Sequence, residues 1–241
     1  MVLDQLSDGA SQHLSVLDEG TRELIFLLCL PLGDGVFATL LVSGAMENVF
    51  SLVSIAVTIF AGAGSLAVLY SRSESRRDAL KMVLKAAPVL VAGAFLVALV
   101  APFYEQIVYV DRMKIVSGLV LLVIAGELLE LDVSRKVPPE AVLLTGLIVS
   151  VRSPEALSFS LKYVAPAVST ALTASAVLLL ASLVNFQRLG LKTVRRGASI
   201  VLVVLAASMF GAELPSGLGI AIFGASLVVS GLEGLDFEPD V

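Results

Sequence analysis

Eight long apolar stretches alternate with short polar ones along the chain, and this pattern predicts an all-α bundle of about eight transmembrane helices. The stretches cover residues 24–46, 49–70, 83–103, 115–131, 141–159, 165–184, 198–212 and 216–232. About 20 residues of α-helix cross a hydrocarbon core of about 30 Å, and these stretches approach or reach that length. Six or seven spans are the alternative, because charged residues interrupt the fifth stretch and the last two could form a hairpin that does not fully cross.

Polar residues at the two ends divide the chain into three parts. Residues 1–23 form a polar leader, residues 24–232 a transmembrane domain, and residues 233–241 an acidic tail. The leader has no basic segment beside a short apolar core, so a cleaved signal peptide is disfavoured and the first span should remain in the mature protein.

Composition indicates that a lipid bilayer surrounds this chain. Hydrophobic residues make up 57% of the sequence and charged residues 15%, against about 25% charged residues in an average soluble domain. The net charge of −5 and the acidic ends argue against nucleic acid as a partner, because they repel phosphate. Single copies of Cys29 and His13 exclude a disulfide framework and a Cys/His metal cluster within one chain, and no cofactor is expected.

The Lys and Arg residues are distributed unevenly between the two sides of the predicted bundle. With eight spans, one side carries both termini and Arg22, Arg72, Arg76, Arg77, Lys81, Lys85, Arg135, Lys136, Arg188, Lys192, Arg195 and Arg196. The opposite side carries only Arg112, Lys114, Arg152 and Lys162. Cytoplasmic loops are enriched in basic residues, so the pattern predicts a multi-pass protein of the cell membrane with both termini in the cytoplasm.

The two halves of the transmembrane domain follow the same order of segments. Residues 24–132 and 138–232 each consist of two spans, a basic loop and two further spans, with the basic loops at 71–85 and 185–197. An even number of spans gives both units the same orientation, so the order predicts a parallel internal repeat. Chance likeness between stretches rich in Leu, Val, Ala, Gly and Ser is the alternative.

A carboxylate near the middle of the first span is the main functional candidate. Asp34 lies about 15 Å into the bilayer if the span enters from the cytoplasm near residue 24. A carboxylate at this depth costs about 2.5–3.5 kcal/mol, so it must be protonated, paired or in contact with a watery cavity. Pro31, Gly33 and Gly35 predict a helix break beside it, as in the discontinuous helices of secondary transporters. The alternative is that Asp34 only ties two spans together through a buried polar contact.

Arg152 is the predicted partner of Asp34. It lies about 16 Å into the fifth span, nearly at the depth of Asp34, and a pair would let two costly charges offset each other. The competing interpretation is that the span stops at Arg152 and that residues 153–155, including Pro154, form an exit or a re-entrant turn. Glu127, one turn before the end of the fourth span, is a further candidate for binding, with hydration at the membrane interface as the alternative.

Other small or polar residues in the spans are assigned to packing. The small residues at 61–65 make the second span slim, which predicts close contact with a neighbouring helix. The sequence around Gly33 and Gly35 lacks the spacing and the Lys of a phosphate loop. No Ser/His/Asp, His-Glu-x-x-His or paired-Asp motif occurs, so we do not expect an enzyme.

Three short motifs resemble a family of uncharacterised integral membrane proteins of halophilic archaea. They are PLGDGVF (31–37), SVRSP (150–154) and TVRRGASIVLV (193–203), and the resemblance extends in segment order over most of residues 24–232. It implies several membrane spans and a high-salt archaeon, and it carries no substrate or activity. A looser likeness exists to small exporters of the lysine-exporter and cation-exchanger type. Their Glu-x-Gly-Asp-Lys/Arg pattern is matched only by Gly33 and Asp34, so cation binding does not transfer from it.

We therefore expect a small secondary transporter or permease for an ion or small solute. Asp34 would bind a substrate cation or a proton, with Arg152 as its gate or counter-ion. The alternative is a non-transporting scaffold that binds lipid or partner proteins through the basic segments 71–85 and 185–197, since each basic residue near an anionic leaflet contributes about 1 kcal/mol. A water-accessible cavity at Asp34 favours transport, and a sealed bundle favours the scaffold.

Overall fold

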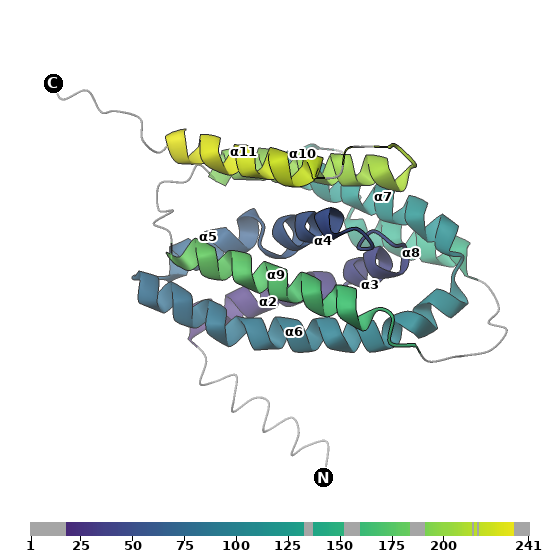
Figure 1. Cartoon of the computed structure of the whole chain (residues 1–241), viewed down its shortest axis with the longest axis horizontal. Coiled ribbons are helices and arrows are strands. Elements are labelled where there is room, and N and C mark those ends of the chain that lie inside the picture. The colour runs from purple at the N-terminus through teal and green to yellow at the C-terminus, as the bar shows by residue number, and fades with distance from the viewer. Residues whose placement is uncertain are drawn as a thin grey trace, which may run out of the picture.

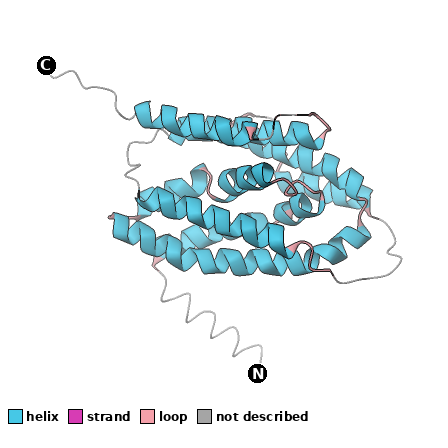
Figure 2. Ribbon diagram, viewed as in Figure 1, coloured by secondary structure: helices cyan, strands magenta, loops and turns pink. Residues whose placement is uncertain are grey.

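The computed structural model describes residues 18–132, 137–151, 160–183, 191–213, 215 and 217–233, and apart from one isolated β-bridge the regular structure within them is helical (Figure 2). In chain order the helices are α2 (Glu19–Gly33), α3 (Val36–Val42), α4 (Val49–Ile55), the π-helix η1 (Ala56–Phe60), α5 (Ala63–Arg72), α6 (Arg76–Ile107), α7 (Val110–Leu128), α8 (Pro139–Ser150), α9 (Val164–Leu183), α10 (Leu191–Met209) and α11 (Leu218–Glu233).

The prediction of an all-α fold is confirmed, and each of the eight apolar stretches contains at least one helix. By length and composition, two described helices, α6 and α9, can each cross a membrane. The first two stretches are each a bent pair of helices, and counting each pair as one span raises the number to four. Helix α8 has 12 residues and α11 has 16, which at about 1.5 Å per residue is short for a core of about 30 Å. Eight spans and the internal repeat therefore stay predictions.

The broken helices lie in the middle of the bundle. Figure 1 shows α10 and α11 along one edge and α6 along the opposite edge, with α2 to α5 and α9 between them. Helix α2 packs against α6 and α5, while α4 packs against α9 and α11. Helix α7 packs against α10 and α8, so α8 lies on the flank of the bundle beside α7.

Small side chains let α6 and α9 pack closely along their length. On α6, buried residues recur every four positions at Ala86, Leu90, Ala94 and Ala98, and α9 buries a comparable series of Ala, Ser and Thr residues. Small residues allow helix backbones to approach closely, which is how helices associate in a membrane. Large apolar side chains such as Leu96, which is 62% exposed, lie on the outside of the bundle, where lipid would cover them.

The prediction that the basic segments 71–85 and 185–197 form loops is partly wrong, because most of their described residues are helical. Helix α6 begins at Arg76, where the Ser75 hydroxyl accepts a hydrogen bond from the Asp78 backbone N–H at 3.2 Å. Residues 191–197 form the first two turns of α10. A Ser N-cap followed by an acidic residue in the first turn starts a helix whatever the charge of the residues that follow, and basic composition alone did not reveal this.

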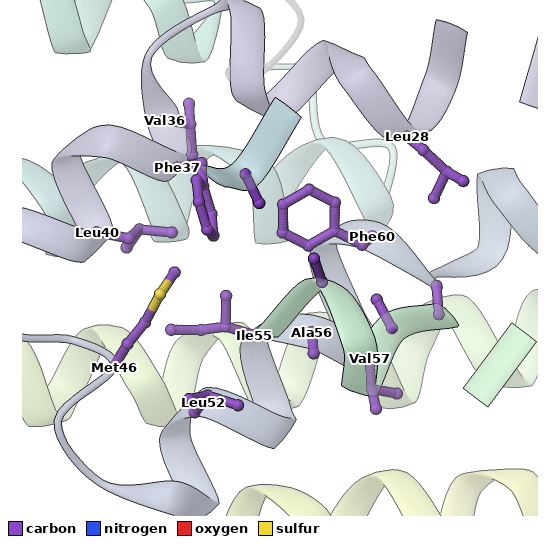
Figure 3. Close-up of a cluster of buried hydrophobic side chains, with 14 of the residues drawn as sticks. Leu28, Val36, Phe37, Leu40, Met46, Leu52, Ile55, Ala56, Val57 and Phe60 are labelled. Carbon is purple, nitrogen blue, oxygen red and sulfur yellow. The ribbon is translucent and has the colours of Figure 1, made fainter. Parts of the chain in front are cut away.

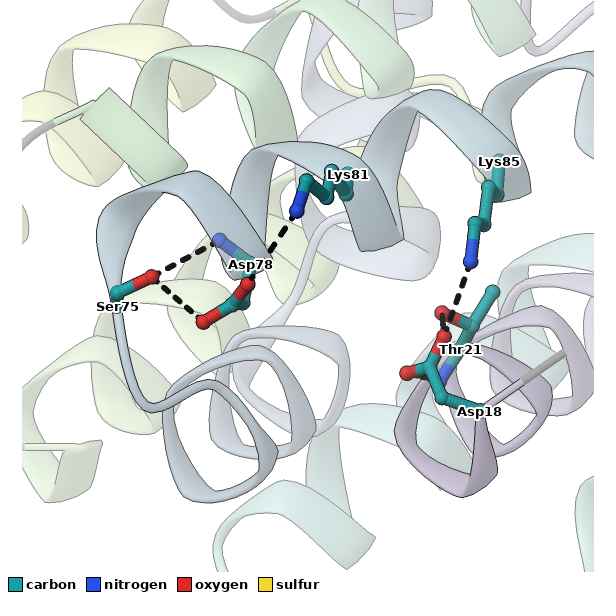
Figure 4. A network of polar contacts seen from close by, with 6 residues as sticks. All are labelled: Asp18, Thr21, Ser75, Asp78, Lys81 and Lys85. Carbon is teal, nitrogen blue, oxygen red and sulfur yellow. Dashed lines mark hydrogen bonds and ion pairs between the residues drawn. The ribbon is translucent and has the colours of Figure 1, made fainter.

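Ion pairs join the basic ends of these helices to their neighbours. Lys85 of α6 lies 3.2 Å from Asp18, which precedes α2, whereas Lys81 pairs within α6 with Asp78 at 3.8 Å (Figure 4). Arg72 pairs with Glu23 at 2.8 Å, and Arg195 of α10 pairs with Glu130, just after α7, at 2.7 Å. Several basic side chains of segments 71–85 and 185–197 are thus engaged with acidic groups of the same chain.

Candidate functional site

The first helix break lies at Asp34 and Gly35. Pro31 remains inside α2, where it removes the N–H that would otherwise pair with the Leu27 carbonyl. Gly35 then takes a φ of +85°, in the left-handed region that glycine adopts without a steric cost, and α3 leaves at an angle of 47° to α2. Helix α2 thus ends at Gly33, and the chain turns at Asp34 and Gly35 before α3 begins.

The second break lies in the next stretch, at Ala61 and Gly62. Helix α4 widens into η1, whose i to i−5 pattern ends with the hydrogen bond from the Ala61 N–H to the Ala56 carbonyl at 3.1 Å. A Cβ atom on Gly62 would clash with the Thr58 carbonyl oxygen, so this close approach of two backbone segments requires glycine. The small residues at 61–65, which the sequence analysis assigned to helix packing, lie where the chain bends by 49°. π-Helical turns inside α-helices are frequent at functional sites.

The two breaks face one cavity of about 400 Å³, which we call the acidic cavity. Its walls come from α2, α3, η1, α5, the last turn of α7 and the first turn of α8. Three carboxylates line it, those of Asp34, Glu127 and Glu140, and none of the described residues lining it is Lys, Arg or His. The rest of the lining is largely apolar, so the cavity combines a strong local negative charge with hydrophobic walls.

The three carboxylates reach the cavity in different ways. Asp34 is half-buried, and its Oδ1 atom accepts a hydrogen bond from the Val36 N–H at 2.9 Å, which caps the first turn of α3. Glu127 and Glu140 are exposed at the end of α7 and the start of α8. Glu140 lies close enough to Asp34 and to Glu127 to repel both carboxylates electrostatically.

Two hydroxyl groups complete the polar part of the acidic cavity. The Thr58 hydroxyl donates to the Ser54 carbonyl at 2.6 Å, and the Ser65 hydroxyl donates to the Phe60 carbonyl at 2.6 Å. Each hydroxyl hydrogen is thereby used within the backbone, and the oxygen keeps lone pairs that can face a positively charged ligand. Together with the carboxylates, these oxygens make a site rich in hydrogen-bond acceptors. In the part of the chain that the structure describes, no group of three or more His, Cys, Asp or Glu side chains is placed to hold a metal ion directly.

The sequence prediction located two of the three carboxylates. The structure brings Asp34 and Glu127 to the same cavity although they are 93 positions apart in the sequence. Glu140 was missed, because a carboxylate in the first turn of a helix after Pro138 and Pro139 is usual for helix capping. The only sequence signal was its place at the start of an apolar segment that follows directly on Glu127 and Glu130.

Arg152 and Pro154 lie outside the described residues, and the pairing of Arg152 with Asp34 stays a prediction. Helix α8 ends at Ser150, nine residues before the predicted end of the fifth span. Val151 forms a β-bridge with Val108 in the turn between α6 and α7, at the other end of α8 from Glu140. Both interpretations of Arg152, as a partner of Asp34 and as the end of the fifth span, therefore stay predictions.

The fold and site thus define a helical bundle with helices suited to a membrane and an acidic cavity between two helix breaks. Residues 90–210 match a family of unknown function, DUF5794, and the chain belongs to this family. The match includes Glu127, Glu140 and two of the three motifs on which the expected resemblance rested, and it confirms an uncharacterised family. No curated protein and no solved structure matches the chain.

Proposed function

We propose that this protein is a small membrane transporter or permease for a cation, which binds in the acidic cavity beside Asp34. The observation that carries the proposal is the cavity itself: two helix breaks meet there, and three carboxylates line it without a basic residue among its described neighbours. Discontinuous helices at a substrate site are the usual arrangement in secondary transporters, since a break presents backbone groups and polar side chains inside the bilayer.

The charge of the cavity favours a positively charged ligand. Glu140 lies close enough to Asp34 and to Glu127 to repel both, which raises the free energy of the empty, fully ionised site. A cation that enters relieves this repulsion, and the hydroxyl oxygens of Thr58 and Ser65 add further acceptors. An anion would meet repulsion from all three carboxylates, which argues against an anionic substrate.

The size of the cavity bears on the form of the cation. A volume of about 400 Å³ corresponds to about a dozen water molecules at roughly 30 Å³ each. This space fits a cation that keeps part of its hydration shell, or a small organic ammonium ion whose apolar part contacts residues such as Leu30 and Ile59. Both kinds of cation carry a single positive charge, which the carboxylates would hold at some distance.

Asp34 has a structural task besides the proposed binding. Its carboxylate caps α3, so removing the side chain would disturb the fold as well as the charge. Asp34→Asn separates the two effects, since the amide oxygen can still accept the hydrogen bond from Val36 while the negative charge is lost. Asp34→Ala removes both the cap and the charge.

The experiment is a flux assay with the full chain in liposomes. Radiolabelled Na⁺, Rb⁺ and methylammonium are offered across a gradient, and uptake is compared between the parent protein, Asp34→Asn and empty liposomes. We expect the parent to take up at least one of these cations and Asp34→Asn to lose roughly tenfold or more of the rate, because a charge inside a membrane protein contributes several kcal/mol to the energetics of the pathway.

Asp78→Asn is the matched control, because Asp78 lies at the start of α6 within an ion pair and away from the acidic cavity. It should keep the parent rate. Uptake by Asp34→Asn at the parent rate would overturn the assignment of the site. No uptake of any of the three cations, together with retention of anionic lipid that depends on Lys192 and Arg196, would favour the scaffold function instead.

A further inference from the structure

A second polar cavity lies at the other end of α3. It has a volume of about 320 Å³, and we call it the outer cavity. Its charged lining residues are Glu47 from the turn after α3, Glu105 near the end of α6, Lys114 near the start of α7 and Lys162 just before α9. Ser43 and Tyr163 add hydroxyl groups. Helix α3 has seven residues and a length of about 10 Å, so one short helix separates the two cavities.

Two residues that line the outer cavity, Glu105 and Lys162, form an ion pair. The Lys162 Nζ atom lies 2.6 Å from Glu105 Oε1 and 4.8 Å from the centre of the Tyr163 ring. This pair connects the end of α6 to the segment that leads into α9. Burial and the neighbouring Glu105 carboxylate raise the pKa of Tyr163, so its hydroxyl stays protonated as a hydrogen-bond donor.

Polar contacts continue from the outer cavity along α3 towards Asp34. Tyr104 directly precedes Glu105 on α6, and its hydroxyl shares a hydrogen bond with the Thr39 hydroxyl of α3, with 3.3 Å between the oxygens. The Ser117 hydroxyl of α7 donates to the Thr39 carbonyl at 3.4 Å. Thr39 lies five residues after Asp34 in the sequence, in the middle of α3, so these contacts lie between the two cavities.

Both ends of α3 carry a residue that suits a hinge. Gly35 before it and Gly44 after it have φ values of +85° and +80°. Glycine adopts this region and the ordinary helical region at similar cost, so the backbone can turn at both points while α3 itself stays helical.

We propose that the outer cavity is the second entrance of the pathway to Asp34, on the membrane side opposite Asp18 and Lys85, and that the ion pair between Glu105 and Lys162 holds it shut in this conformation. The proposal rests on the proposed transport function, because an entrance needs a site to serve. Opening requires Lys162 to leave Glu105. Glu47 is a second carboxylate on the same cavity that can receive the ammonium group in the open state.

The test measures whether water reaches α3 from the side of Lys162. Cys29→Ala removes the native thiol, and Thr39→Cys then places a single thiol between the two cavities. Right-side-out and inverted vesicles are treated with a membrane-impermeant maleimide, and the labelling rate is compared with and without the ion pair. We expect Lys162→Gln and Glu105→Gln each to raise the rate from the Lys162 side by about threefold or more, since a partly exposed ion pair shifts an equilibrium by a modest factor.

Two variants guard against a general loosening of the fold. The exchanged pair, Glu105→Lys with Lys162→Glu, should return the labelling rate to that of the parent. Lys114→Gln removes a positive charge from the same cavity, where Lys114 forms no ion pair with a described residue, and should leave the rate unchanged. A rate that stays constant when the pair is broken, or that rises equally in Lys114→Gln, would overturn the proposal.

The labelling result does not depend on cation uptake. If labelling rises while Asp34→Asn transports like the parent, the entrance stands and the site at Asp34 fails. If Asp34→Asn loses uptake while labelling of Thr39→Cys ignores the ion pair, the site stands and the second entrance fails.

Discussion

Phe37 and Phe60 pack edge to face at the two helix breaks, with ring centroids 5.3 Å apart and ring planes at 79°. Phe37 belongs to the first turn of α3, and Phe60 is the last residue of η1 (Figure 3). Both side chains are fully buried within a cluster that includes Val36, Leu40 and Ile55. The contact fixes one break relative to the other, so the shape of the acidic cavity depends on it.

Removing either ring should destabilise the protein. We expect Phe37→Ala and Phe60→Ala each to lower the free energy of unfolding by about 3 kcal/mol, since each leaves a cavity in a packed core. The double variant should cost about 1 kcal/mol less than the sum, which is the energy of the shared aromatic contact. Equilibrium unfolding in detergent measures all three variants. Phe26→Ala is the control, because Phe26 is 67% exposed on α2. Strictly additive losses would show that the two rings are not coupled.

The first break was predictable from the sequence because its residues are unusual in a membrane helix. Pro31, Gly33, Asp34 and Gly35 each disfavour a continuous apolar helix, and together they indicate one position in the chain. The second break was not predictable on the same grounds. Small residues at 61–65 are equally typical of a tightly packed straight helix, and only the close approach of Gly62 to Thr58 distinguishes the two structures.

Gly33 and Gly35 provide a test of where the first break lies. Gly35→Ala should cost about 1 kcal/mol, because a residue with a Cβ atom is disfavoured at a φ of +85°. Gly33→Ala should be neutral or slightly stabilising, because Gly33 is helical and a Cβ atom there meets nothing within 4 Å. Thermal unfolding of the two purified variants gives the comparison. Equal losses in both would place the break elsewhere.

Gly62 and Gly64 provide the same test for the second break. Gly62→Ala should cost about 1–3 kcal/mol, because the new methyl group would collide with the Thr58 carbonyl and the backbone would have to shift. The shift should also change the acidic cavity, which Thr58 and Gly62 both line. Gly64→Ala meets nothing within 4 Å and should unfold at nearly the parent temperature. A Gly62→Ala variant as stable as Gly64→Ala would contradict the bend.

The polar ends of the helices show what charge counting can and cannot predict. The uneven distribution of Lys and Arg predicted on which side of the membrane the basic segments lie. It did not predict the ion pairs of Lys85 with Asp18 and of Arg195 with Glu130, which join residues more than 60 positions apart. Such pairs depend on which helices become neighbours. No local pattern in the sequence determines that, and the same limit explains why Glu140 was not assigned to the site of Asp34.

Asp18 should make the stability of α2 depend on pH. Its carboxylate accepts hydrogen bonds from the Thr21 hydroxyl at 2.7 Å and the Thr21 N–H at 3.2 Å, and Lys85 lies 3.2 Å away (Figure 4). The hydrogen bond from the Thr21 hydroxyl is the main reason why the pKa of Asp18 lies below its usual value, and Lys85 contributes less. Partial burial opposes this shift. Because the pKa is lower in the folded chain than in the unfolded one, ionised Asp18 stabilises the fold above the ordinary carboxyl range near pH 4, and this stabilisation is lost as the pH falls through the folded-state value.

The comparison is between the parent protein and Asp18→Asn from neutral pH down to about pH 3, a range that spans carboxyl titration. Asparagine can still accept a hydrogen bond at the helix start, so the variant keeps the cap and lacks only the ionisable group. We expect the parent to have the higher Tm at neutral pH and the difference in Tm to shrink on acidification. Because both proteins share every other carboxyl group, effects of those groups on unfolding cancel in the difference. A difference that stays constant or grows as the pH falls would mean that the charge of Asp18 does not stabilise the start of α2.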